Sequence, residues 1–428
     1  MAERSIDSKV KKESAFTLRG ADGIRALACL AVMLHHVSQR LSVQWQPSPV
    51  VRDINAFLLL GNTGVSVFFV LSGFLLSYPF WKQFFNGGQF PDIKQYAVRR
   101  AARIMPGYYL SFVVCSLIIL IFGIPSQYFW IRALSGLTFT AGFNYVTFFP
   151  NEINGPFWSI GFEVFCYLLM PLFMFVMYRL IRKKRTFLKS LIFWLAVVAF
   201  VVFLNSLIHA WFTPDGVRRG WQYGIIGGAK YWMPNYNPIG FFLHFTVGIL
   251  ASGIAAWLFK ISAASGKFGK RGGFDIICAF SLSCAFVLLW LVKRAPEFTL
   301  GFQRQPYYFP LYALLIGAFL AAAPHSNIMG RILDNPFFRY TAKVSFGLYI
   351  WHYVIIYIVS ITMVKNYQVM GMTDLKSWAL VSLAVFAVSY VVAALSYKFI
   401  EKPVLDRVHK RKSGGNRLDI SAQQTVQQ

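Results

Sequence analysis

The chain has 428 residues, of which 57% are hydrophobic and 14% charged, and its formal net charge is +26. Its mean hydropathy of +0.52 is too high for a protein whose whole surface meets water. A basic chain can bind nucleic acid, but about three quarters of the 42 Lys and Arg residues fall in alternate connections between apolar segments. These properties predict an integral membrane protein and argue against nucleic-acid binding.

Ten apolar segments follow one another along the chain, and each approaches the length of about 20 residues that crosses a bilayer. They are residues 22–42, 58–80, 104–124, 156–178, 188–209, 238–259, 275–292, 307–323, 344–364 and 377–397. The excess of Lys and Arg on one side places both termini in the cytosol. We therefore expect an all-α integral membrane protein with about ten transmembrane helices.

The two ends of the chain differ in composition from the part between them. Residues 1–18 are polar and contain Lys, and residues 404–428 are basic and then rich in Gly, Ser and Gln. Both compositions predict disordered cytosolic segments. One transmembrane domain, residues 19–403, is expected between them. Its connections 125–155 and 210–237 are rich in aromatic residues, and either shape a substrate entrance or form an interfacial aromatic belt.

The first apolar segment carries ionisable residues at both ends, Asp22 and Arg25 at one and His35 and His36 at the other. Arg25 and His36 are eleven residues apart, which at 100° per residue leaves them about 20° apart on a helix. His35 is rotated by about 100° from them. Asp22, Arg25 and His36 therefore form a polar stripe that should face the protein interior. His36 is either a general base or a buried histidine with an ordinary hydrogen-bond partner.

Glu163 is the single carboxylate, among the 16 Asp and Glu residues, that lies well inside an apolar segment. Ionisable groups at that depth are costly unless they are paired or hydrated, so they are functional candidates. The alternative is a structural pair that joins two helices. Both Glu163 and His36 are expected in the outer half of the membrane, where the carboxylate would orient the imidazole.

Arg99, Arg100 and Arg103 form a cluster at the start of the third apolar segment. Arginines at such an edge set topology or bind lipid phosphate. Their forked guanidinium groups also suit a phosphate-bearing cytosolic ligand, such as a coenzyme A ester.

Two further mid-segment features have a structural and a functional interpretation. Ser72 and Gly73 permit close helix packing or leave room for a thin ligand. His352 is flanked by aromatic residues and is expected to be a core residue. The five cysteines all fall in apolar segments, and none has the spacing of a metal site, so neither a metal nor a disulfide framework is predicted.

Six motifs occur in order along residues 20–403. They read DGIRALACLAVMLHH, GVSVFFVLSGFLLS, RRAAR, FWSIGFEVFCYLLMP, FGLYIWHYVI and SYKFIEKP. Together they resemble the acyltransferase 3 family, the membrane-bound O-acyltransferases that modify bacterial glycans. One departure is the Glu-Glu-Gln-Phe-Tyr run of that family, which here reads FEVFCY, so one carboxylate and the Gln are absent.

The resemblance implies a multi-pass acyltransferase of the bacterial inner membrane. It would move an acyl group, acetyl above all, from cytosolic acyl-CoA to a sugar hydroxyl of a polysaccharide, a lipid-linked glycan or a glycosylated metabolite. Acyl-CoA would be a co-substrate rather than a permanently bound cofactor, and the other partners would be the acceptor and membrane lipids. The oligomeric state is not predicted.

The resemblance also implies roles for individual residues. Those that bind acyl-CoA would be Arg99, Arg100 and Arg103, which hold the phosphates, and Arg25, which lines the path of the acyl arm with Asp22. His36 would be the general base or a transient acyl carrier, and Glu163 would orient it or relay its proton. Supporting positions would be Ser72, Trp158 and His352.

Two other classes of function remain open at this point. Buried His, Glu and Arg side chains also suit a proton-coupled transporter or a flippase of glycan or lipid intermediates. A non-catalytic partner in a membrane assembly is the third possibility.

Overall fold

The structure is a computed structural model that describes residues 18–42, 48–212, 224–294, 305–365 and 371–408. Within these ranges the chain is helical and has no strand, apart from an isolated bridge between Leu41 and Met372. The prediction of an all-α protein is confirmed. The helices are α2 (Ala21–Ser38), α3 (Pro49–Leu59), α4 (Gly64–Phe85), α5 (Ile93–Ile121), α6 (Phe129–Leu137), α7 (Phe157–Leu180), α8 (Phe187–Phe212), α9 (Gly224–Trp232), α10 (Pro238–Lys260), α11 (Lys267–Lys270), α12 (Gly273–Arg294), α13 (Leu311–Ala322), α14 (Met329–Ile332), α15 (Pro336–Met363) and α16 (Leu375–Ser396).

Each of the ten predicted segments coincides with a helix, but only eight described helical stretches are long and apolar enough to cross a membrane. They are Pro49–Phe85, Ile93–Ile121, Phe157–Leu180, Phe187–Trp211, Pro238–Lys260, Gly273–Arg294, Pro336–Met363 and Leu375–Val408. The two segments that fall short are α2, which carries Asp22 and Arg25, and α13, which has 12 residues. The chain is thus a multi-pass membrane protein, while the count of about ten crossings and the orientation stay predictions.

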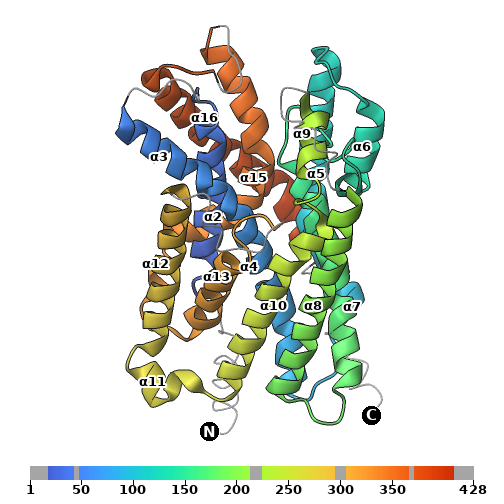
Figure 1. Cartoon of the computed structure of the whole chain (residues 1–428), viewed down its shortest axis with the longest axis vertical. Helices are drawn as coiled ribbons and strands as arrows, with labels where there is room; N and C mark the ends of the chain where they lie inside the picture. The colour runs from blue at the N-terminus through green and yellow to red at the C-terminus, as the bar shows by residue number, and fades with distance from the viewer. Residues whose placement is uncertain (1–17, 43–47, 213–223, 295–304, 366–370, 409–428) are drawn as a thin grey trace, which may run out of the picture.

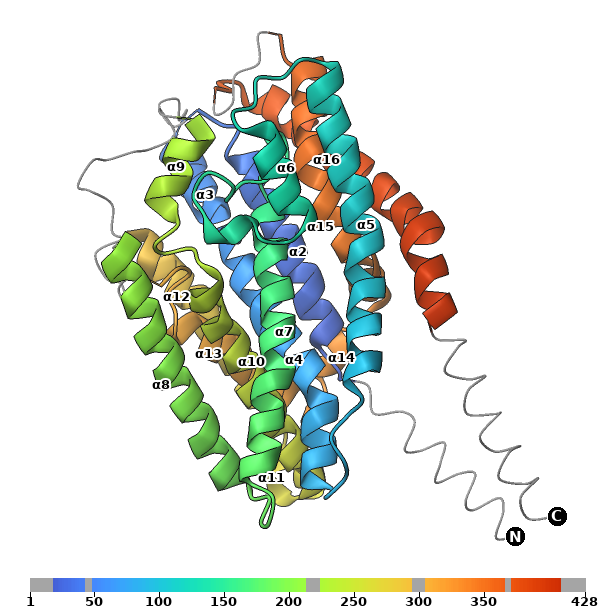
Figure 2. The ribbon, with the colours of Figure 1, turned by 90° about the vertical axis from the view of Figure 1, so that its right-hand side faces the viewer.

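The helices form an elongated bundle in which α10 is central and α8 peripheral (Figures 1 and 2). In the most apolar stretch of α10, 83% of the residues are buried. In the corresponding stretch of α8 only 22% are buried, which leaves an apolar face for lipid. The backbones of α4 and α10 approach closely at two glycines. A Cβ atom at Gly73 would lie 2.1 Å from the Phe245 carbonyl oxygen, and one at Gly248 would lie 1.9 Å from that of Val70. Small residues permit this contact, as the Ser72-Gly73 sequence suggested.

Capping side chains and prolines mark the start of several of the long helices. Asp92 accepts hydrogen bonds from the backbone N–H groups of the first turn of α5. Asn237 and Asn335 cap α10 and α15 in the same way, each directly before a proline at the first helical position. Side-chain acceptors at the cap and proline just inside it are the usual start of a helix, because they satisfy or remove unpaired donors.

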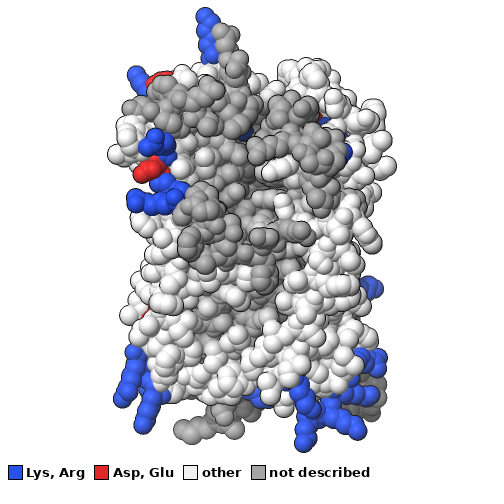
Figure 3. Space-filling model, in the orientation of Figure 1, with Lys and Arg blue, Asp and Glu red and all other residues white. Residues whose placement is uncertain are grey.

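Charged side chains lie at the ends of the bundle and leave its middle apolar. In Figure 3, Lys and Arg gather at the lower end, and the described surface above them is largely uncharged until the upper end. The lower-end residues include the exposed Arg182, Lys183 and Lys184 between α7 and α8, and Lys267 and Lys270 in α11. An apolar zone between two polar ends is the surface expected of a membrane-crossing bundle.

The predicted disordered tail begins too early. The helix that contains α16 continues through a π-helical turn at Tyr397–Glu401 to Val408, so residues 404–408 are helical. The π-helical turn ends two residues before Pro403, whose ring would disrupt a regular α-helix. The remainder of that tail, 409–428, and nearly all of the predicted N-terminal segment, 1–17, lie outside the described residues.

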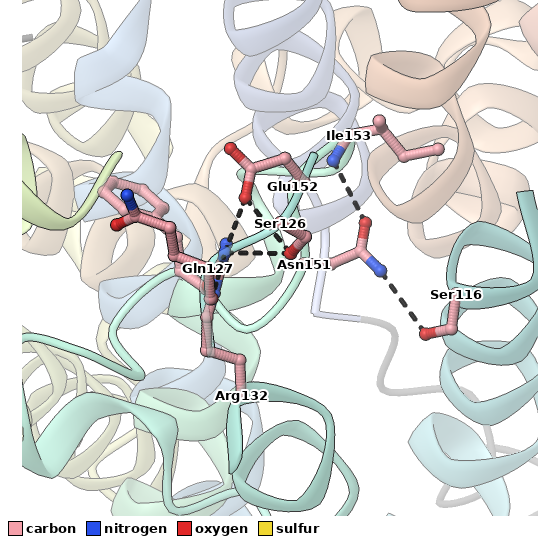
Figure 4. A network of polar contacts seen from close by, with 8 residues as sticks. Ser116, Ser126, Gln127, Arg132, Asn151, Glu152 and Ile153 are labelled. Carbon is pink, nitrogen blue, oxygen red and sulfur yellow. Dashed lines mark hydrogen bonds and ion pairs between the residues drawn. The ribbon is translucent and has the colours of Figure 1, made fainter. Parts of the chain in front are cut away.

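The connection between α5 and α7 is held by a buried arginine (Figure 4). The Arg132 side chain is almost fully buried, and its Nη1 group lies 2.5 Å from Glu152 Oε2 and 3.2 Å from both Ser126 Oγ and the Gln127 carbonyl oxygen. Its Nε–H donates to the Phe149 carbonyl oxygen at 2.8 Å. The connection is therefore a fixed part of the bundle rather than a loose loop.

Arg132→Ala is expected to lower the stability of the protein by about 3 kcal/mol, because it leaves the buried Phe149 carbonyl oxygen without its donor and leaves Glu152 only the Ser126 hydroxyl. Ser126→Ala removes a single neutral partner and should lower stability by only about 1 kcal/mol. Apparent melting temperatures of the detergent-solubilised variants, recorded at one heating rate, compare the two. Equal melting temperatures for wild type and Arg132→Ala would show that the network does not hold this connection.

Candidate active site

A narrow cavity of about 110 Å³ enters the bundle between α2, α4, α5, α7 and α15. Its polar lining brings together residues from all five helices, namely Arg25, Ser72, Arg100, Arg103, Ser159, Glu163, Tyr167, Ser345 and Tyr349. Five of these nine are positions that the sequence singled out. The cavity lies among candidate membrane spans, so its charged groups are at the depth where lipid would exclude them.

Glu163 is anchored in this cavity by two hydroxyl groups. Ser72 Oγ on α4 donates to Glu163 Oε1 at 2.8 Å, and the Tyr167 hydroxyl also donates to Oε1. An ionised carboxylate only accepts hydrogen bonds, so two converging donors suit the charged form. Glu163 therefore lines the cavity, as expected of a functional candidate, and also joins α7 to α4, as expected of a structural residue.

The arginines of the cavity differ in their partners. Arg103 Nη1 lies 3.2 Å from Oε2 of Glu401, whose side chain is fully buried. Arg25 and Arg100 have no ion pair within 4 Å among the described residues. Glu163 is the one carboxylate among the residues that line the cavity, beside three arginines, so the cavity carries a net positive charge and suits an anionic ligand.

Arg99 lies outside this lining. Its guanidinium group folds back on its own helix, where Nε donates to the Gln95 carbonyl oxygen at 3.3 Å and Nη2 donates to the Gln95 side chain. Arg99 and Arg103 are four residues apart on α5, but only Arg103 lines the cavity. The role in donor binding expected for Arg99 has no support from its position.

His36 is paired with His352, a residue of α15. The His36 Nδ1 atom lies 2.8 Å from His352 Nε2, and the His352 Nδ1 atom lies 2.9 Å from the Leu348 carbonyl oxygen. A carbonyl oxygen only accepts, so His352 carries its proton on Nδ1 and a neutral His352 presents a lone pair on Nε2. His36 then donates from Nδ1, which leaves the lone pair of its own Nε2 free to act as a base or nucleophile.

The two adjacent histidines face different neighbours, as the helical geometry predicted. His35 donates from Nδ1 to the Leu59 carbonyl oxygen at 2.6 Å, on the side of α3. His36 meets His352 and the ring of Tyr353, whose centroid is 5.0 Å away in an edge-to-face arrangement. The Arg40 guanidinium group lies 5.1 Å over that Tyr353 ring. His36 is thus part of an aromatic and basic cluster, which His35 contacts through the His36 ring, edge-to-face at 5.0 Å.

The expected contact between Glu163 and His36 is replaced by other partners. Within the described residues, no hydrogen bond or ion pair joins these two side chains. Tyr349 lines the cavity that contains Glu163, accepts or donates a 2.6 Å hydrogen bond with Ser159, and has its ring centroid 6.0 Å from that of His352. The lining of the cavity thus includes Tyr349, which lies about one helical turn from His352 on α15.

The remaining predicted positions have clear locations. Trp158 lies in an aromatic cluster, stacked on Phe148 at 5.8 Å and edge-to-face with Phe241, and does not line the cavity. Asp22 lines a second, wider cavity that Arg25 also borders. The five cysteines are free, and the described residues hold no group of three His, Cys, Asp or Glu side chains placed to bind a metal.

Three residues of the site were missed by the sequence reasoning. Tyr167 follows Glu163 by four residues on one helix, a spacing at which side chains meet, so this contact had a signal. Tyr349 precedes His352 by three residues on one helix, and this spacing also brings side chains together. Glu401, the partner of Arg103, is 298 residues away in the chain, and no local pattern could pair them.

Arg100→Ala is expected to raise the KM for an anionic donor about ten- to hundredfold with a smaller change in kcat, because the lost charged hydrogen bond acts in ground and transition state alike. Arg99→Ala is the matched control, since its side chain lies on the same helix but outside the cavity. Steady-state kinetics of both variants at varied donor concentration make the comparison. An unchanged KM in Arg100→Ala would remove this residue from the donor site.

Eight long apolar helices define a multi-pass membrane protein, and an arginine-lined cavity within it lies near the His36–His352 pair. The model of the acyltransferase domain of the acyltransferase 3 family matches residues 18–398, nearly the whole chain. The chain therefore belongs to this family. No solved structure matches it.

Two relatives with assigned names are similar over most of the chain. The peptidoglycan O-acetyltransferase OatA of Listeria monocytogenes is 24% identical over 402 residues, which cover 90% of this chain and 55% of the relative. The O-acetyltransferase OatA of Staphylococcus aureus is 24% identical over 404 residues, which cover 90% of this chain and 57% of the relative. The chain thus spans little more than half the length of these relatives.

Proposed function

We propose that this protein is a membrane O-acyltransferase that moves an acyl group, acetyl above all, from acyl-CoA to a sugar hydroxyl. The observation that carries the proposal is the positively charged cavity whose lining comes within one helical turn of the His36–His352 pair, in a chain of the acyltransferase 3 family. The names of the relatives support O-acetyl transfer, and one of them names a glycan, peptidoglycan, as the acceptor.

In this proposal, the narrow cavity receives the acyl end of the donor. Arg25 and Arg100 attract and orient the anionic donor, and Arg103 does so from its ion pair with Glu401. Glu163 limits the positive charge of the lining and fixes α7 against α4. The width of the cavity suits a thin, extended arm with a small acyl group rather than a bulky one.

The free Nε2 lone pair of His36 does the chemistry in one of two ways. As a general base, it takes the proton of the acceptor hydroxyl while that oxygen attacks the thioester carbon and the CoA thiolate leaves. As an acyl carrier, it attacks the thioester carbon itself and CoA leaves as the thiolate. The acceptor oxygen then attacks the acyl carbon and displaces the imidazole, and the acceptor proton passes to the thiolate. In both cases the acyl carbon must come within reach of His36, which does not line the cavity in this structure.

The test is an assay of the full-chain protein in detergent with radiolabelled acetyl-CoA and peptidoglycan fragments or other glycans as acceptors. Release of CoA that depends on the acceptor, with label on the glycan, supports the proposal. Proton flux across vesicles without CoA release would instead identify a transporter and contradict it.

A rapid acid quench distinguishes the two roles of His36. Label that remains on the wild-type protein in the absence of acceptor, and is absent from His36→Ala, identifies an acyl carrier. Full turnover by wild-type protein with no such label at any time identifies a general base.

A further inference from the structure

A second cavity, of about 540 Å³, lies where the start of α2 meets α14 and the first turn of α15. Figure 2 shows α14 beside the lower end of α2, well above the lower ends of α7 and α8. Arg25 and Leu75 line this wide cavity and the narrow cavity alike, so the two adjoin. A molecule with a bulky head and a thin arm would fit this pair of spaces.

The wide cavity is lined by basic side chains that lack ion-pair partners. Arg19, Arg331 and Arg339 border it, and none of the three has a carboxylate within 4 Å among the described residues. Gly330 lets α14 approach the start of α2, because a Cβ atom there would lie 2.9 Å from Arg19 Cβ. The fold thus holds three guanidinium groups around one space, with Arg25 at its inner border.

Two carboxyl groups, those of Asp22 and Asp334, also line the wide cavity. Asp334 Oδ2 accepts the Gly20 N–H at 3.0 Å, while its buried Oδ1 has no hydrogen-bond partner among the described residues. Burial raises the pKa of Asp334, and the nearby Asp22 acts in the same direction. These carboxyl groups are available to accept hydrogen bonds from hydroxyl or amino groups of a ligand.

We infer that the wide cavity binds the 3′-phosphorylated adenosine diphosphate end of coenzyme A, with Arg19, Arg331 and Arg339 on its phosphates. This inference rests on the proposed function. It differs from the sequence-based expectation, which gave the phosphates to Arg99, Arg100 and Arg103. Three clustered arginines match the negative charge of this group, and the two carboxyl groups match its ribose hydroxyls and adenine amine.

An anionic lipid headgroup shares the phosphate but offers a weaker match. The wide cavity adjoins the narrow cavity within the bundle at Arg25 and Leu75, whereas the acyl chains of a lipid would have to leave toward the bilayer. The nucleotide end of an acyl-CoA, in contrast, places its thin arm in the narrow cavity. The structure therefore favours the nucleotide, and the lipid becomes an outcome of the test.

The test measures equilibrium binding of CoA, 3′-dephospho-CoA and 4′-phosphopantetheine to the purified full-chain protein at one ionic strength, because screening alters exposed arginines. Wild type is expected to bind CoA about ten- to hundredfold more tightly than 3′-dephospho-CoA. In Arg331→Ala/Arg339→Ala this preference should disappear, while the affinity for 4′-phosphopantetheine should not change. Arg99→Ala, outside both cavities, should keep the wild-type preference.

Unchanged binding of 4′-phosphopantetheine separates loss of the nucleotide site from loss of the fold. Equal binding of CoA and 3′-dephospho-CoA by wild type, or a preference that survives in the double variant, would overturn the inference. So would a double variant that keeps the preference but loses binding to phosphatidylglycerol vesicles relative to phosphatidylcholine vesicles, which would identify a lipid site. Wild type that binds none of the three compounds would contradict the acyl-CoA donor itself.

Discussion

His36→Ala is expected to lower kcat by a factor of roughly 10² to 10⁴ if His36 is a general base, and by more if it carries the acyl group. The reason is its position: His36 Nδ1 is engaged by His352 at 2.8 Å, which leaves Nε2 as the free reactive nitrogen. Alanine is readily accommodated in a helix, so expression and membrane insertion should stay close to those of wild type.

His35→Ala is the matched control, because the two histidines are adjacent and chemically identical. The His35 ring donates to the Leu59 carbonyl oxygen on another side of α2 and does not touch His352. Its loss should lower stability by about 1 kcal/mol and leave most of the turnover. Turnover of both variants is measured at matched protein levels. An inactive His35→Ala beside an active His36→Ala would overturn the assignment of this helix.

The helices could be predicted from the sequence because a helix that contacts lipid needs a long apolar segment. Long apolar segments bounded by charges gave the place of every long helix, and the arrangement of caps such as Asn237-Pro238 and Asn335-Pro336 explains where two of them begin. The same signal could not decide how many of them cross the membrane. The helix α13 is short and buried against its neighbours. A short apolar segment has the same sequence pattern in a buried core helix and in a helix that crosses the membrane.

Within the candidate site, the sequence predicted on which face of a helix a side chain lies better than it predicted which residue that side chain contacts. The rotation of 100° per residue correctly separated His35 from His36. Similar depth suggested that Glu163 would meet His36, but depth does not say which helices are neighbours. Glu163 is bonded instead to Ser72 and Tyr167, and His36 to His352. His352 pairs with His36 across 316 residues, and such a contact has no local sequence pattern.

The sequence singled out Asp22 and Arg25 of the wide cavity but gave no signal for Arg19, Arg331 and Arg339. These three arginines come from the segment before α2, from the four-residue helix α14 and from the first turn of α15. Taken singly, each of these residues is an ordinary basic residue near the end of an apolar segment, which the positive-inside tendency explains. Only the packing of α14 against the start of α2 brings them around one space.

The pairing of the two histidines predicts a second large effect. His352→Ala is expected to lower kcat roughly ten- to hundredfold and to leave the donor KM almost unchanged, because His352 does not line the cavity. Without its acceptor, the Nδ1–H of His36 loses the bond that fixes the tautomer and the ring orientation. His352 is in this view a positioning residue, which acts through His36.

His352→Gln and His352→Phe separate this role from packing. The Gln amide oxygen can accept the proton of His36 Nδ1 from a position near that of the lost Nε2, so Gln should restore part of kcat, whereas Phe fills the space without an acceptor. Steady-state kinetics of the three variants give kcat and KM separately. If Phe restores turnover as well as Gln does, the 2.8 Å contact serves packing alone, and His36 needs no partner to present its Nε2 lone pair.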